Sequence, residues 1–344
     1  MAYTTIKKPS DYFNTKIFTG DGSLPRAITG VGHQSDFVWL KNRDVGYQHQ
    51  LYDSVRGTSA GVLYSSLSDA EDSTYQMSSF DSDGYTMGSQ MGAVNGSGEN
   101  IVSWSWKANG TGASNTDGSI TSTVSANTTS GFSIVSYTGT GTQPSTVGHG
   151  LGVTPKMFIV KPRTDAQSWC VYHESVGAGY LTYLDITSAS GGSSVWNSTS
   201  PTSSVFTVND NQVNSSGITY IAYCFAEVKG FSKFGSYTGN GNADGTFVYT
   251  GFKPAFTMIK RTDTTSDWNI MDNKRAVSFN PNTKELYANS SQAEATGGQT
   301  IRDFLSNGFK LRGTSGGTNA SGGTYIYMAF AEEPLVGDNP ATAR

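Results

Sequence analysis

The stretch "VNSSGITYIAYCFAEVKG", residues 213–230, is a turn signal followed by an apolar run. Two similar stretches occur about a hundred residues away on either side, "VNGSGENIVSWSWKANG" at 94–110 and "TNASGGTYIYMAFAEEP" at 318–334. Each stretch contains Asn-x-Ser-Gly followed by a strand-like run. A phrase that returns at a fixed period is the signature of an internal repeat, so we expect one kind of unit used three times.

The rest of each copy agrees with this interpretation. Every copy opens with an aromatic residue and Thr-Gly-x-Gly, in "FTGDG" at 18–22, "YTGTG" at 137–141 and "YTGNG" at 237–241. A strand that ends in basic residues follows, in "DFVWLKNRD" at 36–44, "KMFIVKPRTD" at 156–165 and "AFTMIKRTD" at 255–263. A second strand comes next, in "HQLYD", "WCVYH" and "WNIMD". The sequence therefore predicts β-repeats at 17–108, 132–230 and 232–334.

The closing strand indicates the architecture of each repeat. In the second copy Ile221, Tyr223 and Phe225 alternate with Tyr220, Ala222 and Cys224, so both faces are largely apolar. Such a strand belongs in a sheet that is covered on both sides. Charged residues make up only 15% of the chain, aromatic residues reach 12%, and glycine occurs 41 times, a composition typical of all-β proteins. We expect an all-β chain of three tandem β-sandwich or jelly-roll-like repeats.

Three segments lie outside the repeats. Residues 1–16 are expected to form an N-terminal docking segment, and 335–344 a C-terminal tail. Residues 109–131 form a Gly/Ser/Thr-rich linker that could add a strand through Ile120 and Val124. Almost nothing joins the second repeat to the third. Because these two linkers are so unequal, the sequence favours a string of domains over a pseudo-threefold ring.

Composition and motifs argue against several classes of function. The net charge of −4 and the lack of a basic block argue against nucleic-acid binding, and no segment is apolar enough for membrane insertion. The four histidines and two cysteines show no spacing typical of a metal site or a disulfide framework. We expect no catalytic residue, metal or cofactor. Trp169 and Trp268 occupy one repeat position, which His49 fills in the first copy, and this recurrence indicates packing.

A sugar ligand would bind by stacking on exposed aromatic rings, with polar groups contacting its hydroxyls. Aromatic residues that do not recur between the repeats are the better candidates for such contacts. The candidate ligand-binding residues are Tyr47, Tyr75, Tyr180 and Trp196.

Several long phrases resemble tail-fibre-like virion proteins of marine tailed phages. Among them are "NTDGSITSTVSANTTSGFSIVSYTGTG", "VGHGLGVTPKMFIVK" and "YIAYCFAEVKGFSKFGSYTGNG", and the resemblance covers nearly the whole chain. It implies a structural virion protein, a tail fibre or spike adhesin that attaches to a host cell-surface glycan. It also implies other virion proteins as partners, a homotrimer, and assembly into the virion in the host cytoplasm.

Two alternatives stay open beside the adhesin. One is a non-adhesive virion component, such as a head decoration, a neck appendage or a fibre connector. The other is a polysaccharide depolymerase, which the sequence disfavours because no pair of carboxylates stands out from the scattered acidic residues.

Overall fold

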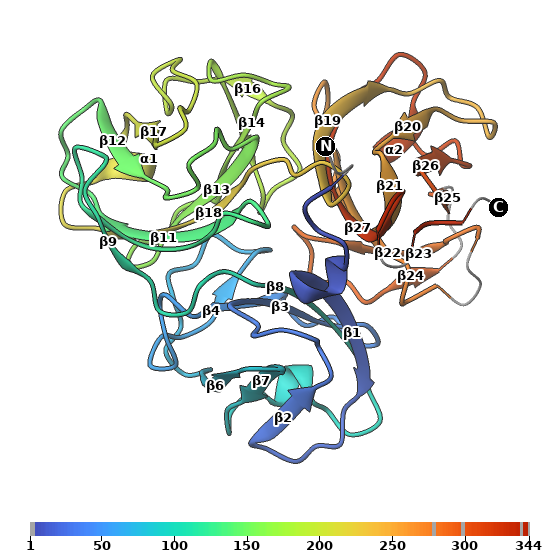
Figure 1. The fold of residues 1–344 in the computed structure, drawn as a ribbon, viewed down its shortest axis with the longest axis horizontal. Helices are drawn as coiled ribbons and strands as arrows, with labels where there is room; N and C mark the ends of the chain where they lie inside the picture. Colours follow the sequence, from blue (N-terminus) through green and yellow to red (C-terminus); the bar gives the residue numbers. More distant parts are fainter. Residues whose placement is uncertain (1–3, 277–279, 297–299, 338–339, 343–344) are drawn as a thin grey trace.

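The computed structural model describes residues 4–276, 280–296, 300–337 and 340–342, and within them the chain is all-β, as predicted. The strands form six sheets, and every ladder between them is antiparallel. Figure 1 shows three lobes arranged around a common centre. Each lobe contains one large sheet and one small sheet. We call these lobes the first, second and third units.

The first unit contains β1–β8. Its large sheet has the order β1-β8-β3-β4-β5 and its small sheet the order β2-β7-β6. Two short 3₁₀ turns, η1 (Pro9–Asp11) and η2 (Gly92–Val94), accompany them. The strands are β1 (Phe13–Thr19), β2 (Arg26–Thr29), β3 (Phe37–Asn42), β4 (Gln50–Asp53), β5 (Leu63–Tyr64), β6 (Met77–Asp81), β7 (Gly84–Met87) and β8 (Asn100–Trp106).

The second unit contains β9–β18. Its large sheet has the order β16-β15-β14-β13-β18-β11-β10-β9, and β12 pairs with β17. One helical turn, α1 (Asn211–Asn214), precedes the closing strand. The strands are β9 (Ala113–Asn115), β10 (Ser122–Asn127), β11 (Phe132–Thr138), β12 (Ser145–Gly148), β13 (Met157–Pro162), β14 (Cys170–His173), β15 (Tyr180–Tyr183), β16 (Gly191–Gly192), β17 (Val205–Val208) and β18 (Thr219–Phe225).

The third unit contains β19–β27. Its large sheet has the order β19-β27-β21-β22-β23-β24 and its small sheet the order β20-β26-β25. The turn α2 (Gly316–Asn319) occupies the place of α1. The strands are β19 (Ser232–Thr238), β20 (Phe247–Tyr249), β21 (Phe252–Arg261), β22 (Trp268–Asp272), β23 (Lys284–Tyr287), β24 (Ala295–Thr296), β25 (Arg302–Leu305), β26 (Gly308–Leu311) and β27 (Thr324–Pro334).

The closing strands β8, β18 and β27 are covered on both faces, as their apolar patterns predict. One face of each large sheet packs on the small sheet of its own unit, which gives three separate clusters. The other face packs in a single cluster shared by all three units, which we call the central core. Alternate residues of the closing strands build it: Val102, Trp104 and Trp106; Ile221, Tyr223 and Phe225; Ile326, Met328 and Phe330.

The shared core shows that the expected string of domains is wrong. The three units form a pseudo-threefold ring, each with one sheet face turned toward the same centre (Figure 1). The unequal linkers are compatible with a ring because the longer one is not a spacer. Residues 109–131 contribute β9 and β10, which extend the large sheet of the second unit beyond β11. The added strand that the sequence suggested is therefore present, and Ile120 and Val124 pack in the core of the second unit.

The N-terminal segment belongs to the folded ring. The first unit begins at Phe13, four residues before the predicted boundary, because β1 pairs with β8 from that residue onward. Ahead of it, Ile6 is 1% exposed and packs in the central core. The described part of the expected docking segment 1–16 is thus anchored by apolar burial. At the other end, β27 ends at Pro334, where the third repeat was expected to end.

The recurring Asn-x-Ser-Gly turn connects the two ends of each repeat. Asn95, Asn214 and Asn319 are all 0% exposed. In the third unit, Asn319 Oδ1 accepts a hydrogen bond from the backbone N–H of Asn240 (3.0 Å), and its Nδ2 donates to the carbonyl of Asn242 (2.8 Å). The opening Thr-Gly-x-Gly loop is thereby tied to the closing turn. The need for a short amide side chain with both a donor and an acceptor explains why asparagine occupies this position in all three repeats.

The glycines of the opening loop permit this close approach. A Cβ on Gly239 would lie 2.3 Å from the carbonyl oxygen of Ala320, and Gly241 has a φ of +66°. The backbone N–H of Gly241 donates to the carbonyl of Asn319 (2.8 Å). Substitution by any residue with a side chain would push the loop away from the turn.

We expect Asn319→Ala to lower the free energy of unfolding by about 1–3 kcal/mol, because it leaves buried backbone groups without hydrogen-bond partners. Urea unfolding followed by fluorescence measures this. The matched control is Asn240→Ala in the opposite loop, where the side chain is exposed and the expected loss is about 0.5 kcal/mol or less. Equal losses for the two variants would contradict the role assigned to Asn319.

Candidate functional site

Three equivalent lysines join the units into a ring. Lys41, Lys161 and Lys260 stand at the ends of β3, β13 and β21, and each is 0% exposed. Each Nζ donates to a carbonyl of the neighbouring unit: Lys41 to Ser291 (3.0 Å), Lys161 to Ser68 (3.0 Å) and Lys260 to Thr187 (2.8 Å). Burial lowers the pKa of each ammonium group to about 8. The three interfaces therefore share one arrangement, a buried lysine that donates to a carbonyl of the neighbouring unit.

A backbone hydrogen bond at each interface fixes the equivalent positions. The N–H of Glu294 donates to the carbonyl of Arg43 (2.7 Å) between the third and first units. Glu71 donates in the same way to Arg163 (2.8 Å) between the first and second units. Between the second and third units the same bond joins Ser190 to Thr262 (3.0 Å).

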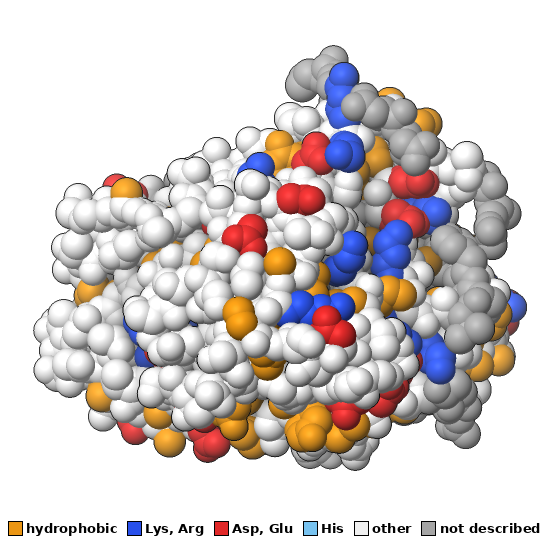
Figure 2. Space-filling view, turned by 90° about the horizontal axis from the view of Figure 1, so that it is seen from below, with side chains coloured by type: hydrophobic (Ala, Val, Ile, Leu, Met, Phe, Trp, Pro, Cys, Tyr) orange, Lys and Arg blue, Asp and Glu red, His pale blue; other side chains and the backbone are white. Residues whose placement is uncertain are grey.

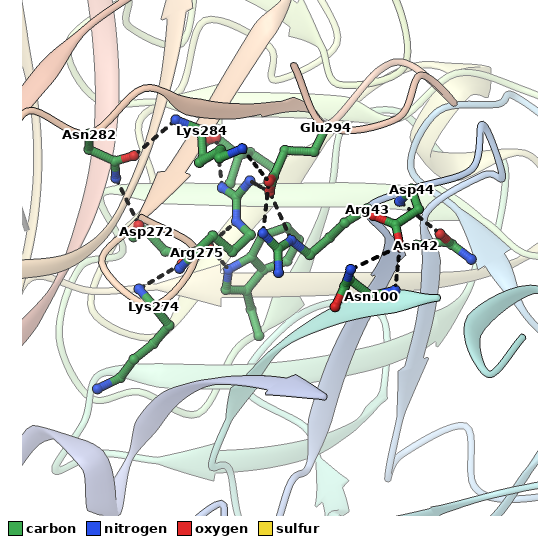
Figure 3. A network of polar contacts seen from close by, with 12 residues as sticks. Asn42, Arg43, Asp44, Asn100, Asp272, Lys274, Arg275, Asn282, Lys284 and Glu294 are labelled. Atoms are coloured by element: carbon green, nitrogen blue, oxygen red, sulfur yellow. Dashed lines mark hydrogen bonds and ion pairs between the residues drawn. The ribbon is translucent and has the colours of Figure 1, made fainter. Parts of the chain in front are cut away.

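A buried ion cluster fills the interface between the third and first units (Figure 3). Arg275 contacts Asp272 (2.6 Å) and Glu294 (2.8 Å), and Glu294 also accepts two hydrogen bonds from Arg43 (2.8 and 2.9 Å). The side chains of Arg275 and Asp272 are fully buried. Burial raises the pKa of Glu294, but the two guanidinium groups more than offset this, so its pKa lies below the ordinary value.

The interface between the first and second units repeats the cluster. Arg56 contacts Asp53 (2.5 Å) and Glu71 (3.1 Å), and Glu71 contacts Arg163 (2.8 Å). The hydroxyl of Tyr223 donates to Asp53 (2.8 Å), as Trp104 Nε1 donates to Asp272 (3.0 Å) at the previous interface. Burial again raises the pKa of Glu71, and Arg163 and Arg56 bring it below its ordinary value.

The interface between the second and third units lacks this cluster. His173 takes the place of the aspartate, and three residues on, Val176 stands where the other units have Arg56 and Arg275. Ser190 replaces the glutamate and Thr262 the second arginine. The ring of His173 lies 3.2 Å from the carbonyl of Tyr327, and burial lowers its pKa to about 4, so it is neutral near pH 7. None of the four charges is retained.

A groove of about 560 Å³ opens where the cluster is missing, between the second and third units. We call it the hydroxyl groove, because nine of its eleven lining residues carry a hydroxyl group and none carries a charge. The residues that line it are Ser175, Val176, Tyr180, Ser190, Ser236, Tyr237, Thr238, Thr262, Thr324, Tyr325 and Ile326. The small replacements Val176, Ser190 and Thr262 all belong to this set. Loss of large ionic side chains therefore accounts for the space.

The candidate ligand-binding residues lie in different places. Tyr180, at the start of β15, is 50% exposed and lines the hydroxyl groove. Tyr47 is 42% exposed near the interface of the first and third units, where its carbonyl accepts from Lys41 (2.7 Å). Tyr75 is half-buried against the core of the first unit. The structure does not bring the four candidates together.

Trp196 requires a correction. It is 0% exposed, and its ring packs against Phe158 (4.8 Å between centroids) and Tyr172 (6.4 Å) in the core of the second unit. A ring with no exposed face cannot stack on an external sugar. The packing role inferred for Trp169 and Trp268 is confirmed, since they are 0% and 1% exposed and donate to carbonyls of the neighbouring unit.

One difference between the repeats in the sequence indicates the hydroxyl groove. The two copies with ion clusters read "DSVR" at 53–56 and "DNKR" at 272–275, while the second copy reads "HESV" at 173–176. Comparison of these segments shows that the second copy alone has lost both the aspartate and the arginine. Across the interface, Arg43 and Arg163 stand two residues after Lys41 and Lys161, whereas Thr262 stands two residues after Lys260. The aligned repeats therefore show the loss of this arginine as well.

The described ranges offer neither a metal-binding cluster nor a membrane-spanning helix. They contain no group of three or more His, Cys, Asp or Glu side chains that could hold a metal ion. They also contain no helix that is long and apolar enough to cross a membrane.

Comparison with known proteins gives a family and no individual relative. No curated protein and no solved structure matches the chain. A family match runs over residues 8–334, from the residue before η1 to the last residue of β27. It spans the whole ring, so the three units with their shared core correspond to one family unit. The chain belongs to the family described as Domain of unknown function (DUF7483).

Proposed function

We propose that the chain is a virion structural protein of a tailed phage, a tail fibre or spike adhesin that attaches to a glycan on the host cell surface. The observation that carries the adhesin is Tyr180, which is half-exposed in the hydroxyl groove. An exposed aromatic ring among hydroxyl groups offers both contacts that a sugar needs, a stacking face and hydrogen-bond partners. The long phrases that resemble tail-fibre-like proteins support the location on the particle.

The surface suits a protein exposed on a particle. Uncharged polar side chains and backbone atoms predominate on the face in Figure 2, and the charged side chains gather mainly in its centre and right half. The shared central core makes the three units one rigid body, which holds the groove in a fixed shape. This rigidity also supports the second candidate function, a non-adhesive part such as a head decoration, a neck appendage or a fibre connector.

Immunogold electron microscopy separates these functions. Antibodies against the chain are applied to particles of the phage that encodes it, and fluorescently labelled chain is added to host cells. The adhesin predicts label at the tail and saturable binding to cells that competes with adsorption of the phage. Label on the head or neck without cell binding would favour the second candidate. Particles without label would contradict both.

The homotrimer implied by the resemblance stays a prediction. The pseudo-threefold ring within one chain removes one reason for it, because three copies of the fold already close around an axis. Light scattering of the purified chain measures the mass, and three times 36.6 kDa is the expected result. A mass of one chain in solution, together with single copies on the particle, would contradict the trimer.

A further inference from the structure

We infer that the hydroxyl groove is the ligand site and that its ligand is a neutral saccharide. This rests on the proposed glycan-binding function and names the place and the chemical class. The groove lies between residues 175–190 of the second unit and the third-unit strands β19 and β27, so both units contribute to it. It exists at one interface of a ring whose other two interfaces are filled by ions.

Comparison of equivalent positions at the interfaces shows which side chains leave the groove open. At the interface of the first and second units, the positions equivalent to Val176, Ser190 and Thr262 hold Arg56, Glu71 and Arg163. Two guanidinium groups and a carboxylate occupy the space there, and every one of them is paired. The interface of the second and third units carries short side chains at all of these positions, Val176 and Ser190 from the second unit and Thr262 from the third. No ionic group needs to be displaced before a ligand enters.

The lining groups favour a sugar without charge. Acidic sugars are recognised by arginine or lysine, which form charge-assisted hydrogen bonds with carboxylate or sulfate groups. None of the eleven lining residues can form such a bond. A neutral sugar instead needs hydroxyl partners along its edge and an apolar surface against its C–H face. Tyr180, Val176 and Ile326 supply apolar surface beside the hydroxyl groups.

Several hydroxyl groups of the groove already have partners, among them those of Tyr237 and Tyr325, which donate to the carbonyls of Thr318 (2.7 Å) and Gly316 (2.8 Å). Thr262 Oγ1 lies 2.8 Å from Thr324 Oγ1, and Ser190 Oγ lies 2.6 Å from Thr182 Oγ1. These pairs fix the side chains, and each oxygen retains acceptor capacity. The Tyr180 hydroxyl has no hydrogen-bond partner among the described residues. The Tyr180 ring is thus accessible, and its hydroxyl group is able to donate a hydrogen bond to a ligand.

The test rebuilds, at the interface of the second and third units, the ion cluster that the other two interfaces carry. The filled variant combines His173→Asp, Val176→Arg, Ser190→Glu and Thr262→Arg, which adds two charges of each sign. A second variant, Tyr180→Ala, removes only the exposed ring. The matched control is Tyr249→Ala, which removes a similarly exposed tyrosine outside the groove. Circular dichroism and thermal unfolding of each variant report whether the fold is kept.

Binding is measured on an array of neutral hexose and N-acetylhexosamine oligosaccharides together with uronate-, sialate- and sulfate-bearing ones. We expect the wild type to bind neutral members, with an affinity that is unchanged between low and high NaCl because no charged pair is screened. Tyr180→Ala should weaken binding about tenfold or more, and the filled variant should abolish it. Tyr249→Ala should bind as the wild type does.

The outcomes separate the two proposals. Neutral-sugar binding that survives in both Tyr180→Ala and the filled variant overturns the assignment of the groove and leaves the adhesin intact. Salt-sensitive binding to acidic members alone overturns the chemical class. Failure of the wild type to bind any member of the array or any host cell overturns the glycan-binding function itself. If the filled variant does not fold, the result for Tyr180→Ala decides between these outcomes.

Discussion

Phe330→Ala is expected to lower the free energy of unfolding by about 3–5 kcal/mol, the cost of removing a large aromatic ring from a packed core. Phe330, within β27, is 1% exposed. Its ring lies 4.9 Å from that of Phe13, 5.7 Å from Trp106 and 6.1 Å from Phe225, between centroids. Two of these partners belong to the first unit and one to the second. The cavity would therefore open where all three units meet.

The same contacts predict that the ring unfolds as one cooperative body. Urea unfolding of the variant should shift a single transition, with coincident midpoints by near-UV and far-UV circular dichroism. Tyr249→Ala is the surface control, since Tyr249 is 56% exposed on β20 and its loss should change stability by about 0.5 kcal/mol or less. A loss below about 1 kcal/mol for Phe330→Ala, or two separated transitions, would contradict a shared core.

The closing strands explain how far the sequence predicts this fold. Alternating apolar residues on both faces of 220–225 indicate a strand covered on both sides, and the structure confirms it. The pattern does not say what covers the second face. Burial against a sheet of the same unit and burial against the sheets of two neighbouring units require the same apolar residue types. The sequence pattern therefore does not distinguish these two arrangements. The choice between a string and a ring depends on contacts such as that of Phe13 with Phe330, which are more than three hundred residues apart.

The hydroxyl groove was predictable only in part. Tyr180 could be selected because it does not recur between the repeats, and its exposure agrees with that selection. Trp196 was selected on the same ground and is buried, so absence of recurrence does not separate a surface residue from a core residue of one unit. The groove also depends on Ser190 and Thr262, which meet through a backbone hydrogen bond across two units. Nothing in their spacing indicates that contact.

The ion cluster allows a second large effect to be predicted. We expect Arg275→Ala to lower the free energy of unfolding by about 3–5 kcal/mol, because it leaves Asp272 and Glu294 buried with one cationic partner fewer. The side chains of these two acids are 0% and 6% exposed. Val176→Ala, at the equivalent position of the second unit, is the matched control. It should cost only about 1 kcal/mol, since it removes two methyl groups and breaks no ion pair.

The loss in Arg275→Ala should depend on pH. In the wild type Arg43 and Arg275 hold the pKa of Glu294 below its ordinary value, so this carboxylate stabilises the fold above that ordinary value and the contribution is lost as pH falls. Without Arg275, burial is opposed only by Arg43 and by the more distant Lys284 (3.9 Å), and the pKa of Glu294 rises. Protonation then relieves the unpaired charge, and the difference from the wild type should shrink between pH 7 and pH 5. A difference that stays constant over this range would assign the loss to packing.

Removing the whole cluster should cost less than removing its central arginine. The interface between the second and third units forms without any of these charges, with His173, Val176, Ser190 and Thr262 in their places. A variant that copies it, with Asp272→His, Arg275→Val, Glu294→Ser and Arg43→Thr, leaves no buried ion without a partner. Buried ion clusters are often replaced as a set at little cost, although breaking them singly is expensive. In urea unfolding at pH 7, the fourfold variant should therefore have a higher free energy of unfolding than Arg275→Ala. The opposite order would show that the cluster stabilises the ring by more than the pairing of its own charges.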